Sequence, residues 1–464
     1  NVAEPGATCR NMLSQAEEMT LRMQTDEKIN FAEDWKLISL FIGGNDLCAV
    51  CRRWERYNPE QHVADIKSAL DYLYEHVPNA IVQVITMFDI SPLIDMKSGD
   101  AGRDLICNTM HNQFCDCAKN VTTNAQLRDI QMEYWERLDA LINEQGTYDQ
   151  PGRQDFTVVM QPYMRDMKPF IFEDGIWDMT YFSPDCFHPS RKMHFSMAYG
   201  LWNTMLTPVP EKVFDYPEEE ELEFFCPSEE RPYIFTNLNS GDSKKAAEEE
   251  KKLILIEESQ DSPVSDLQDF KSKMQRAQAK YLSLPADARA HYEQLLQMEN
   301  RDDELEIPDW TCDPPEVDGS SPANAHQVRP QDVQVVASFG DSITAGNGVG
   351  ADTLPGVAIE NRGDVWTVGG NGSIETHVTI PNILRQFNPS VTGWSWSRSS
   401  LVGERNDTHC AQQWNCAQLN VAEPGATCRN MLSQAEELTL WMQMDEKSSF
   451  AEDWRLIILS IGGN

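Results

Sequence analysis

A serine with glycine neighbours follows a short apolar run late in the chain. Residues 333–339 are apolar and rich in β-branched side chains, which predicts a buried strand. Ser342 follows two residues after Gly340, and Gly346 and Gly348 come next. Because α/β sheets bind ligands at the carboxyl ends of their strands, this position suits a nucleophile. A phosphate-binding turn is the alternative, although no Gly-Lys-Ser/Thr sequence follows.

A serine hydroxyl is a poor nucleophile unless a base and a group that orients the base lie beside it. Among nine histidines, His188 has an aspartate, Asp185, three residues before it, on a proline-bounded segment ahead of an expected helix at 193–206. We interpret His188 as the base and Asp185 as its orienting carboxylate. The same spacing is also typical of a hydrogen-bonded surface pair or a helix cap.

Acyl transfer also needs hydrogen-bond donors for the tetrahedral oxyanion. Gly6 offers a backbone N–H that a substrate can approach closely, and Asn45 follows an apolar run that ends in Ile-Gly-Gly. Both positions occur twice, the second time as Gly425 and Asn464. An ordinary turn glycine and an ordinary left-handed asparagine are the alternatives.

An internal repeat sets the organisation of the chain. Residues 1–45 recur as residues 420–464 with eight differences and a constant offset of 419. We therefore expect the back part of one unit at 1–240, a connector at 241–332 and the front part of the next unit at 333–464. The chain would then begin and end inside two successive units, the first without the serine block and the second without the Asp/His block.

The complementary gaps suggest that the serine strand could enter the sheet of the first unit, as in a circular permutation. The 153 residues between His188 and Ser342 make loop closure only about a few kcal/mol more costly than a short loop. The duplicated glycine and asparagine segments would then compete for one place, which would favour an inactive chain.

The remaining elements alternate between strand and helix patterns. Apolar runs at 37–42, 80–88, 156–160 and 456–461 predict further strands, and helical spacing recurs at 9–23 and 63–73. Strands that alternate with amphipathic helices predict a parallel sheet covered on both faces.

The connector differs from both flanks. Residues 217–223 and 242–260 are charge-rich and residues 307–332 are rich in Pro, Asp and Ser, which is typical of solvated linker. Between them, apolar residues with 3-4 spacing at 267–284 and a second helix from Pro285 to about 298 predict a helical hairpin or short coiled coil. We interpret it as a spacer with one apolar face, with a binding module as the alternative.

Composition limits the classes of partner and compartment. The chain has 464 residues, 41% of them hydrophobic, and a formal net charge of −36, which excludes a nucleic-acid or anionic-surface binder and suits an uncharged or zwitterionic substrate. The Cys48/Cys51 and Cys115/Cys117 pairs are typical of disulfides or of a zinc site. Sequons at Asn120, Asn371 and Asn406 favour a secreted glycoprotein and hence disulfides. No apolar run reaches the ~20 residues of a membrane-spanning helix.

The serine, glycine, asparagine and histidine blocks together resemble the SGNH, or GDSL, hydrolase superfamily, and they follow the family order once the repeat joins the two units. Four further segments resemble the animal phospholipase B group of that superfamily: 342–348, 368–372, 380–384 and 182–188. The similarity covers about residues 1–240 and 307–464, and it leaves 241–306 unassigned.

The resemblance implies a three-layer α/β/α sandwich, flavodoxin-like, with about five parallel strands and the serine strand at the centre. It implies hydrolysis of acyl esters in phospholipids and related lipids at a membrane or micelle surface, with no metal and no cofactor. It also implies the secretory pathway, with an extracellular or apical cell-surface location. The alternatives are a non-catalytic extracellular lipid-binding or spacer array, or an inactive fragment.

Overall fold

A parallel sheet of four strands forms the centre of the computed structural model. The structure describes residues 1–400 except 169, 173, 214–222, 242–265, 300–308, 313–320 and 397. The sheet has the order β3-β2-β1-β4, and each neighbouring pair is parallel. Its strands are β1 (Trp35–Phe41), β2 (Ala80–Ile85), β3 (Phe156–Gln161) and β4 (Val333–Gly340). The expected strands at 37–42, 80–88, 156–160 and 333–339 are confirmed, and 456–461 lies outside the described residues.

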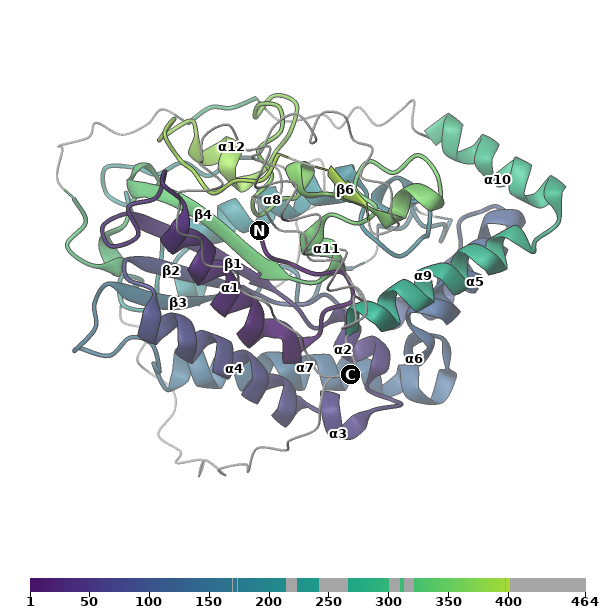
Figure 1. Cartoon of the computed structure of the whole chain (residues 1–464), viewed down its shortest axis with the longest axis horizontal. Helices are drawn as coiled ribbons and strands as arrows, with labels where there is room; N and C mark the ends of the chain where they lie inside the picture. Colours follow the sequence, from purple (N-terminus) through teal and green to yellow (C-terminus); the bar gives the residue numbers. More distant parts are fainter. Residues whose placement is uncertain are drawn as a thin grey trace, which may run out of the picture.

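Helices cover both faces of this sheet (Figure 1), which confirms the α/β sandwich. One face carries α1 (Met12–Thr25), α4 (Pro59–His76) and α7 (Val121–Asp139), and the other carries α8 (Arg191–Met205) and α12 (Ile380–Leu384). Every residue of β1, β2 and β3 is buried, because helices cover both faces of these strands. The expected helices at 9–23, 63–73 and 193–206 correspond to α1 with its preceding turn, α4 and α8.

Further helices, single turns and a small second sheet complete the described chain. The remaining α-helices are α2 (Gly44–Ala49), α3 (Trp54–Tyr57), α5 (Ala101–Phe114), α6 (Asp116–Lys119), α9 (Asp266–Leu282), α10 (Ala286–Glu299) and α11 (Ser342–Ala345). A small antiparallel pair joins β5 (Ile359–Asn361) to β6 (Arg398–Ser400), and η3 (Ala140–Glu144) is a π-helical turn that continues α7. Single 3-10 turns are η1 (Cys9–Asn11), η2 (Ser91–Asp95), η4 (Met179–Tyr181), η5 (Val209–Glu211), η7 (Ala325–Gln327), η8 (Pro330–Asp332), η9 (Pro355–Ala358) and η10 (Arg362–Asp364).

The strand that leads to the serine comes from the far end of the chain and pairs with the first strand. Leu37 of β1 lies opposite Val336 of β4, and Phe41 lies opposite Gly340. The two strands are therefore in register up to their carboxyl ends. Segments almost 300 residues apart in sequence share one sheet, the arrangement that the permutation hypothesis requires.

The expectation that β4 lies at the centre of about five strands is wrong for the described residues, because β4 is the last of the four. On its outer side, Thr392 makes only an isolated parallel bridge to Val335. The chain turns away at Gly393, which has a φ of 83°. A Cβ there would lie 2.2 Å from the backbone oxygen of Val336, so the close approach requires a glycine and the ladder stops.

The connector does contain the predicted pair of helices, α9 and α10. They pack against α5 through a small apolar cluster separate from the main core. Its buried members are Ile106, Met110, Phe114, Ala277, Tyr281, Tyr292, Leu296 and Leu354. Much of the expected linker at 217–223, 242–260 and 307–332 lies outside the described residues.

Candidate active site

Ser342 lies where the sequence predicts it, at the carboxyl end of β4 and the start of α11. Asp341 caps α11, and its Oδ1 accepts a hydrogen bond of 3.0 Å from the Ile343 N–H. Gly340 allows the turn to lie against β1, because a Cβ there would be 2.3 Å from the Phe41 backbone oxygen. The hydroxyl is thus held on a short connection between two rigid elements.

The loop at 183–188 holds Asp185 and His188 in one tight hydrogen-bond network. Asp185 Oδ1 accepts from the backbone N–H groups of His188 and Phe187 and from the Ser183 hydroxyl, at 2.9, 3.0 and 2.9 Å. Burial alone would raise the pKa of Asp185, but the charge of His188 and these donors outweigh it and lower that pKa below the usual value. Asp185 is therefore an ionised carboxylate at neutral pH.

The fold brings these three side chains together across 154 positions in sequence. His188 Nδ1 lies 2.6 Å from Asp185 Oδ2, and His188 Nε2 lies 3.0 Å from Ser342 Oγ. With the imidazole proton assigned to Nδ1, the ring donates to the carboxylate and accepts from the serine hydroxyl. This linear arrangement can remove the proton from Ser342 as the hydroxyl attacks.

Gly6 and Asn45, the oxyanion candidates of the first copy, lie at the same edge of the sheet as Ser342. The N-terminal segment is tied to β4 because the Glu4 N–H donates to the Gly340 oxygen at 3.1 Å. Gly6 follows with a φ of 81°, in the left-handed region that favours glycine. Asn45 is the second residue of α2, and its Nδ2 donates to the Ala7 oxygen at 2.9 Å. Their role as oxyanion donors remains a prediction, and Gly425 and Asn464 lie outside the described residues.

A buried polar cluster behind Asn45 was not foreseen from the sequence. The Asp46 carboxylate accepts from the Cys9 N–H at 3.2 Å and lies 3.2 Å from His62 Nδ1. The Cys9 thiol in turn donates to Asp65 at 3.4 Å, and burial raises its pKa. The atoms of Cys9, Asp46 and His62 that could ligate a metal ion lie within 4.8 Å of one another. They are already hydrogen-bonded in this network, so we assign them to support of the Asn45 turn.

The unusual pKa of Asp341 was also not foreseen from the sequence. Burial raises its pKa to about 7, and the nearby charge of Asp46 adds to this, while the backbone N–H donors at the start of α11 oppose it. Its place between Gly340 and Ser342 was visible in the motif, but its burial depends on the surrounding elements.

The paired cysteines form disulfides, and the zinc alternative is wrong. Cys48 is bonded to Cys115 and Cys51 to Cys117, which ties α2 to α6 behind the asparagine turn. The other bonds in the described part of the chain join Cys107 to Cys186 and Cys226 to Cys312.

The candidate catalytic side chains are buried, whereas Asn45 at the same edge of the sheet is partly exposed. Ser342 is only 4% exposed and His188 is fully buried. A surface hollow of about 590 Å³ lies elsewhere, around Pro208, Tyr233 and His326, and none of the predicted site residues lines it. We therefore do not assign the substrate to that hollow.

The predicted glycosylation sites differ in their surroundings. Asn120 is exposed at the start of α7, where its side-chain oxygen accepts from the N–H groups of Thr122 and Thr123. Asn371 uses its Nδ2, the atom that would carry a glycan, to donate to Asp364 at 2.7 Å. The geometry thus favours Asn120 as an acceptor, and Asn406 lies outside the described residues.

Within the described residues, no helix combines the length and apolar character that crossing a membrane would need.

Comparisons with known proteins complete the description of the site. A model of the family described as GDSL-like Lipase/Acylhydrolase matches residues 1–201 and 336–464. The chain is 33% identical to "Phospholipase B1, membrane-associated" of Homo sapiens and 32% identical to the protein of the same name of Rattus norvegicus, in both cases over its whole length. It spans 27% of the length of each of these relatives. No solved structure matches.

Proposed function

Because the chain belongs to the family of GDSL-like lipases and acylhydrolases, we propose that it hydrolyses acyl ester bonds of phospholipids and related lipids. The family and its class of chemistry, ester hydrolysis, agree with the expectation from the sequence motifs. The substrate class is supported by the relatives, which are named as phospholipases. The observation that carries the proposal is the 3.0 Å contact between Ser342 Oγ and His188 Nε2.

In this mechanism Ser342 Oγ attacks the acyl carbon while His188 Nε2 takes its proton. Asp185 holds the imidazole in the required tautomer and stabilises the imidazolium that forms. His188 then gives the proton to the departing alcohol, which leaves an acyl ester on Ser342. Water then attacks the acyl carbon while His188 Nε2 takes its proton. The second tetrahedral intermediate collapses as His188 gives that proton to Ser342 Oγ, which releases the fatty acid and free Ser342.

We assign the oxyanion to the backbone N–H of Gly6 and the side-chain amide of Asn45. Each such donor is worth about 3 to 4 kcal/mol where it has been removed in other enzymes. The Asn45 amide has two hydrogens, and one is engaged by the Ala7 oxygen. This contact orients the amide so that its other hydrogen is available to the substrate.

We also propose that residues 1–240 and 333–400 act as one catalytic module, with 241–332 as the connector. The support is the pairing of β4 with β1 together with the 3.0 Å contact across that junction. The first-copy segments, which carry Gly6 and Asn45, occupy the place for which the second copies would compete.

We place the protein in the secretory pathway, at the cell surface or outside the cell. Four disulfides in the described residues support an oxidising compartment, and the relatives are named as membrane-associated. A lipid surface would then supply the substrate.

The decisive test compares Ser342→Ala with the wild-type chain on phospholipid and lysophospholipid micelles. We expect loss of ester hydrolysis by about a thousandfold or more, because the nucleophile is gone. Ser68→Ala is the matched control, since Ser68 is an exposed serine on α4 whose hydroxyl contacts only the Ala64 oxygen. Equal rates for wild type and Ser342→Ala would reject the assembled site, and lipid binding without turnover would favour the non-catalytic array.

A further inference from the structure

The backbone conformation of Cys186 determines the geometry of the loop that carries Asp185 and His188. It lies between the carboxylate and the imidazole, with a φ of 58°, in the left-handed region that residues other than glycine seldom occupy. Its N–H donates to the Ser183 oxygen at 2.8 Å, which closes the turn. A backbone held in such a conformation persists only when its surroundings enforce it.

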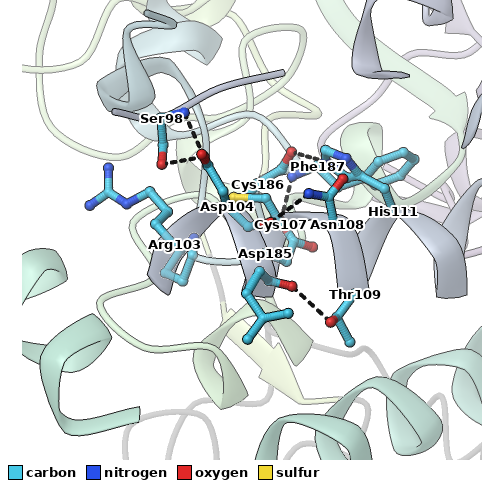
Figure 2. The surroundings of a disulfide bond; sticks show 12 residues. Ser98, Arg103, Asp104, Cys107, Asn108, Thr109, His111, Asp185, Cys186 and Phe187 are labelled. Carbon is cyan, nitrogen blue, oxygen red and sulfur yellow. Dashed lines mark hydrogen bonds between the residues drawn. A yellow bond between two sulfur atoms is a disulfide. The ribbon is translucent and has the colours of Figure 1, made fainter. Parts of the chain in front are cut away.

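Helix α5 supplies that enforcement from one face. Cys107 is joined to Cys186 by a disulfide, and one turn later His111 Nε2 lies 2.7 Å from the Cys186 oxygen. Figure 2 shows both side chains reaching Cys186 from the same helix. Residues four apart lie on one helix face, so α5 holds a single residue by a covalent bond and a hydrogen bond together.

The same face continues to the imidazole itself. Phe114, seven residues after Cys107, stacks on Phe187 with ring centroids 5.5 Å apart and meets His188 edge-on at 5.8 Å. On α5, Cys107 and His111 thus contact residue 186, and Phe114 contacts residues 187 and 188. Helix α5 therefore packs along the loop from Cys186 to His188.

The hydrogen bond from His111 does not depend on pH over the physiological range. Burial lowers the pKa of His111 to about 4, so the ring is neutral. A neutral ring that contacts a carbonyl oxygen through Nε2 must carry its proton there. The donor is therefore constant, and it acts as a structural tie.

We propose that Cys107 and His111 are positioning residues, which set the reactivity of Ser342 by holding Cys186 so that Asp185 and His188 keep their alignment. The inference rests on the proposed function. It adds a role for α5 that neither the serine nor the histidine block contains. Without this latch, defined here as Cys107, His111 and Cys186, the loop keeps its internal hydrogen bonds but loses its fixed orientation toward Ser342.

The first test removes the disulfide of the latch and compares it with a matched bond elsewhere. In Cys107→Ser/Cys186→Ser we expect kcat to fall at least tenfold with KM within about twofold of wild type. The control is Cys226→Ser/Cys312→Ser, because its bond spans 86 residues against 79 and so constrains the unfolded chain to a similar degree. Equal kcat losses in the two variants, or full activity in the latch variant, would overturn the proposal.

The second test varies the hydrogen bond alone. His111→Leu removes the donor, whereas His111→Gln restores an N–H at a similar reach. We expect kcat to fall about tenfold in the leucine variant and to recover severalfold in the glutamine variant, with thermal midpoints within a few degrees of each other. A glutamine variant no better than leucine, or a leucine variant as active as wild type, would contradict a positioning role.

A third readout does not require turnover. The 2.6 Å contact between His188 Nδ1 and Asp185 should give a far-downfield proton resonance, assigned by its absence in His188→Ala. We expect this resonance in wild type and in the Cys226→Ser/Cys312→Ser control, and its loss or broadening in the latch variants. Its persistence in those variants would refute the latch, whereas a resonance that behaves as expected in a chain without hydrolysis would refute only the proposed function.

Discussion

The carboxyl group of Asp341 shows how one residue can couple the serine turn to pH. It is 2% exposed, and its pKa lies near 7 in the folded chain against 3.8 for the free side chain. The folded state therefore binds a proton between about pH 4 and pH 7 that the unfolded state has released. Stability falls as the pH rises through this window, because the unfolded side chain gains free energy by releasing its proton while the buried side chain retains its own.

Asp341→Asn should remove this pH dependence. A shift of about three pKa units corresponds to about 4 kcal/mol, so the wild type should lose a few kcal/mol relative to the variant between pH 4 and pH 8. Asparagine keeps the oxygen that accepts from Ile343, so the helix cap survives. Urea unfolding at both pH values measures the difference, with the exposed Glu55→Gln as control. A difference between Asp341→Asn and wild type that does not change with pH would contradict this origin.

At the scale of elements, the site depends on the close approach of β4 to β1 at their carboxyl ends. The strands are in register from Leu37 and Val336 to Phe41 and Gly340, and Ser342 follows at once. The connector helices contact the other part of the site, the loop that carries Asp185 and His188. The Tyr292 hydroxyl of α10 donates to the Pro184 oxygen beside Asp185. The connector is thus packed against the histidine loop, which the interpretation as a spacer did not foresee.

Gly340→Ala should damage both stability and activity. Its Cβ would lie 2.3 Å from the Phe41 backbone oxygen, a contact that only a backbone shift can relieve. We expect a loss of about 2 to 4 kcal/mol in the free energy of unfolding and at least a tenfold loss of hydrolysis, since Ser342 moves with β4.

Gly152→Ala is the matched control for this change, because nothing lies within 4 Å of the Cβ that it would add. Thermal unfolding and esterase rates of the two variants decide the matter. A Gly340→Ala variant as stable and as active as the Gly152→Ala variant would show that the strand ends are not tightly coupled.

At the scale of the whole molecule, the formal net charge of −36 would influence how the chain meets the lipid surface that we propose as the source of its substrate. An anionic protein is repelled by an anionic lipid surface. A zwitterionic surface carries no net charge and so does not repel it. The repulsion is screened when the Debye length shortens with salt.

We therefore expect faster hydrolysis of phosphatidylcholine micelles than of micelles containing an anionic phospholipid at low ionic strength. The ratio of the two rates should approach one as the salt concentration rises from about 10 mM to 1 M, where the Debye length falls from about 30 to about 3 Å. Initial-rate assays over that salt series measure it. A ratio that is insensitive to salt would place the lipid preference in local contacts of the site.

By itself, the sequence determined the four strands of the parallel sheet, several of the helices and which residue types carry the chemistry, but it did not indicate α5 or α7. Residues 80–85 and 333–340 are strands, and the connector helices lie where their 3-4 spacing predicts them, because periodicity reports how each segment meets a core. Ser342, Asp185 and His188 could be selected because the chemistry needs a hydroxyl, a carboxylate and an imidazole.

Only the tertiary structure decided which of these segments meet. It joined the serine of one partial unit to the histidine of the other, set β4 last in the sheet and paired Cys107 with Cys186. No local pattern contains this information, since strand order and disulfide pairing follow from the free energy of contacts between distant segments. Loop closure depends only weakly on the length between them, so the chain length alone could neither require nor forbid the assembled site.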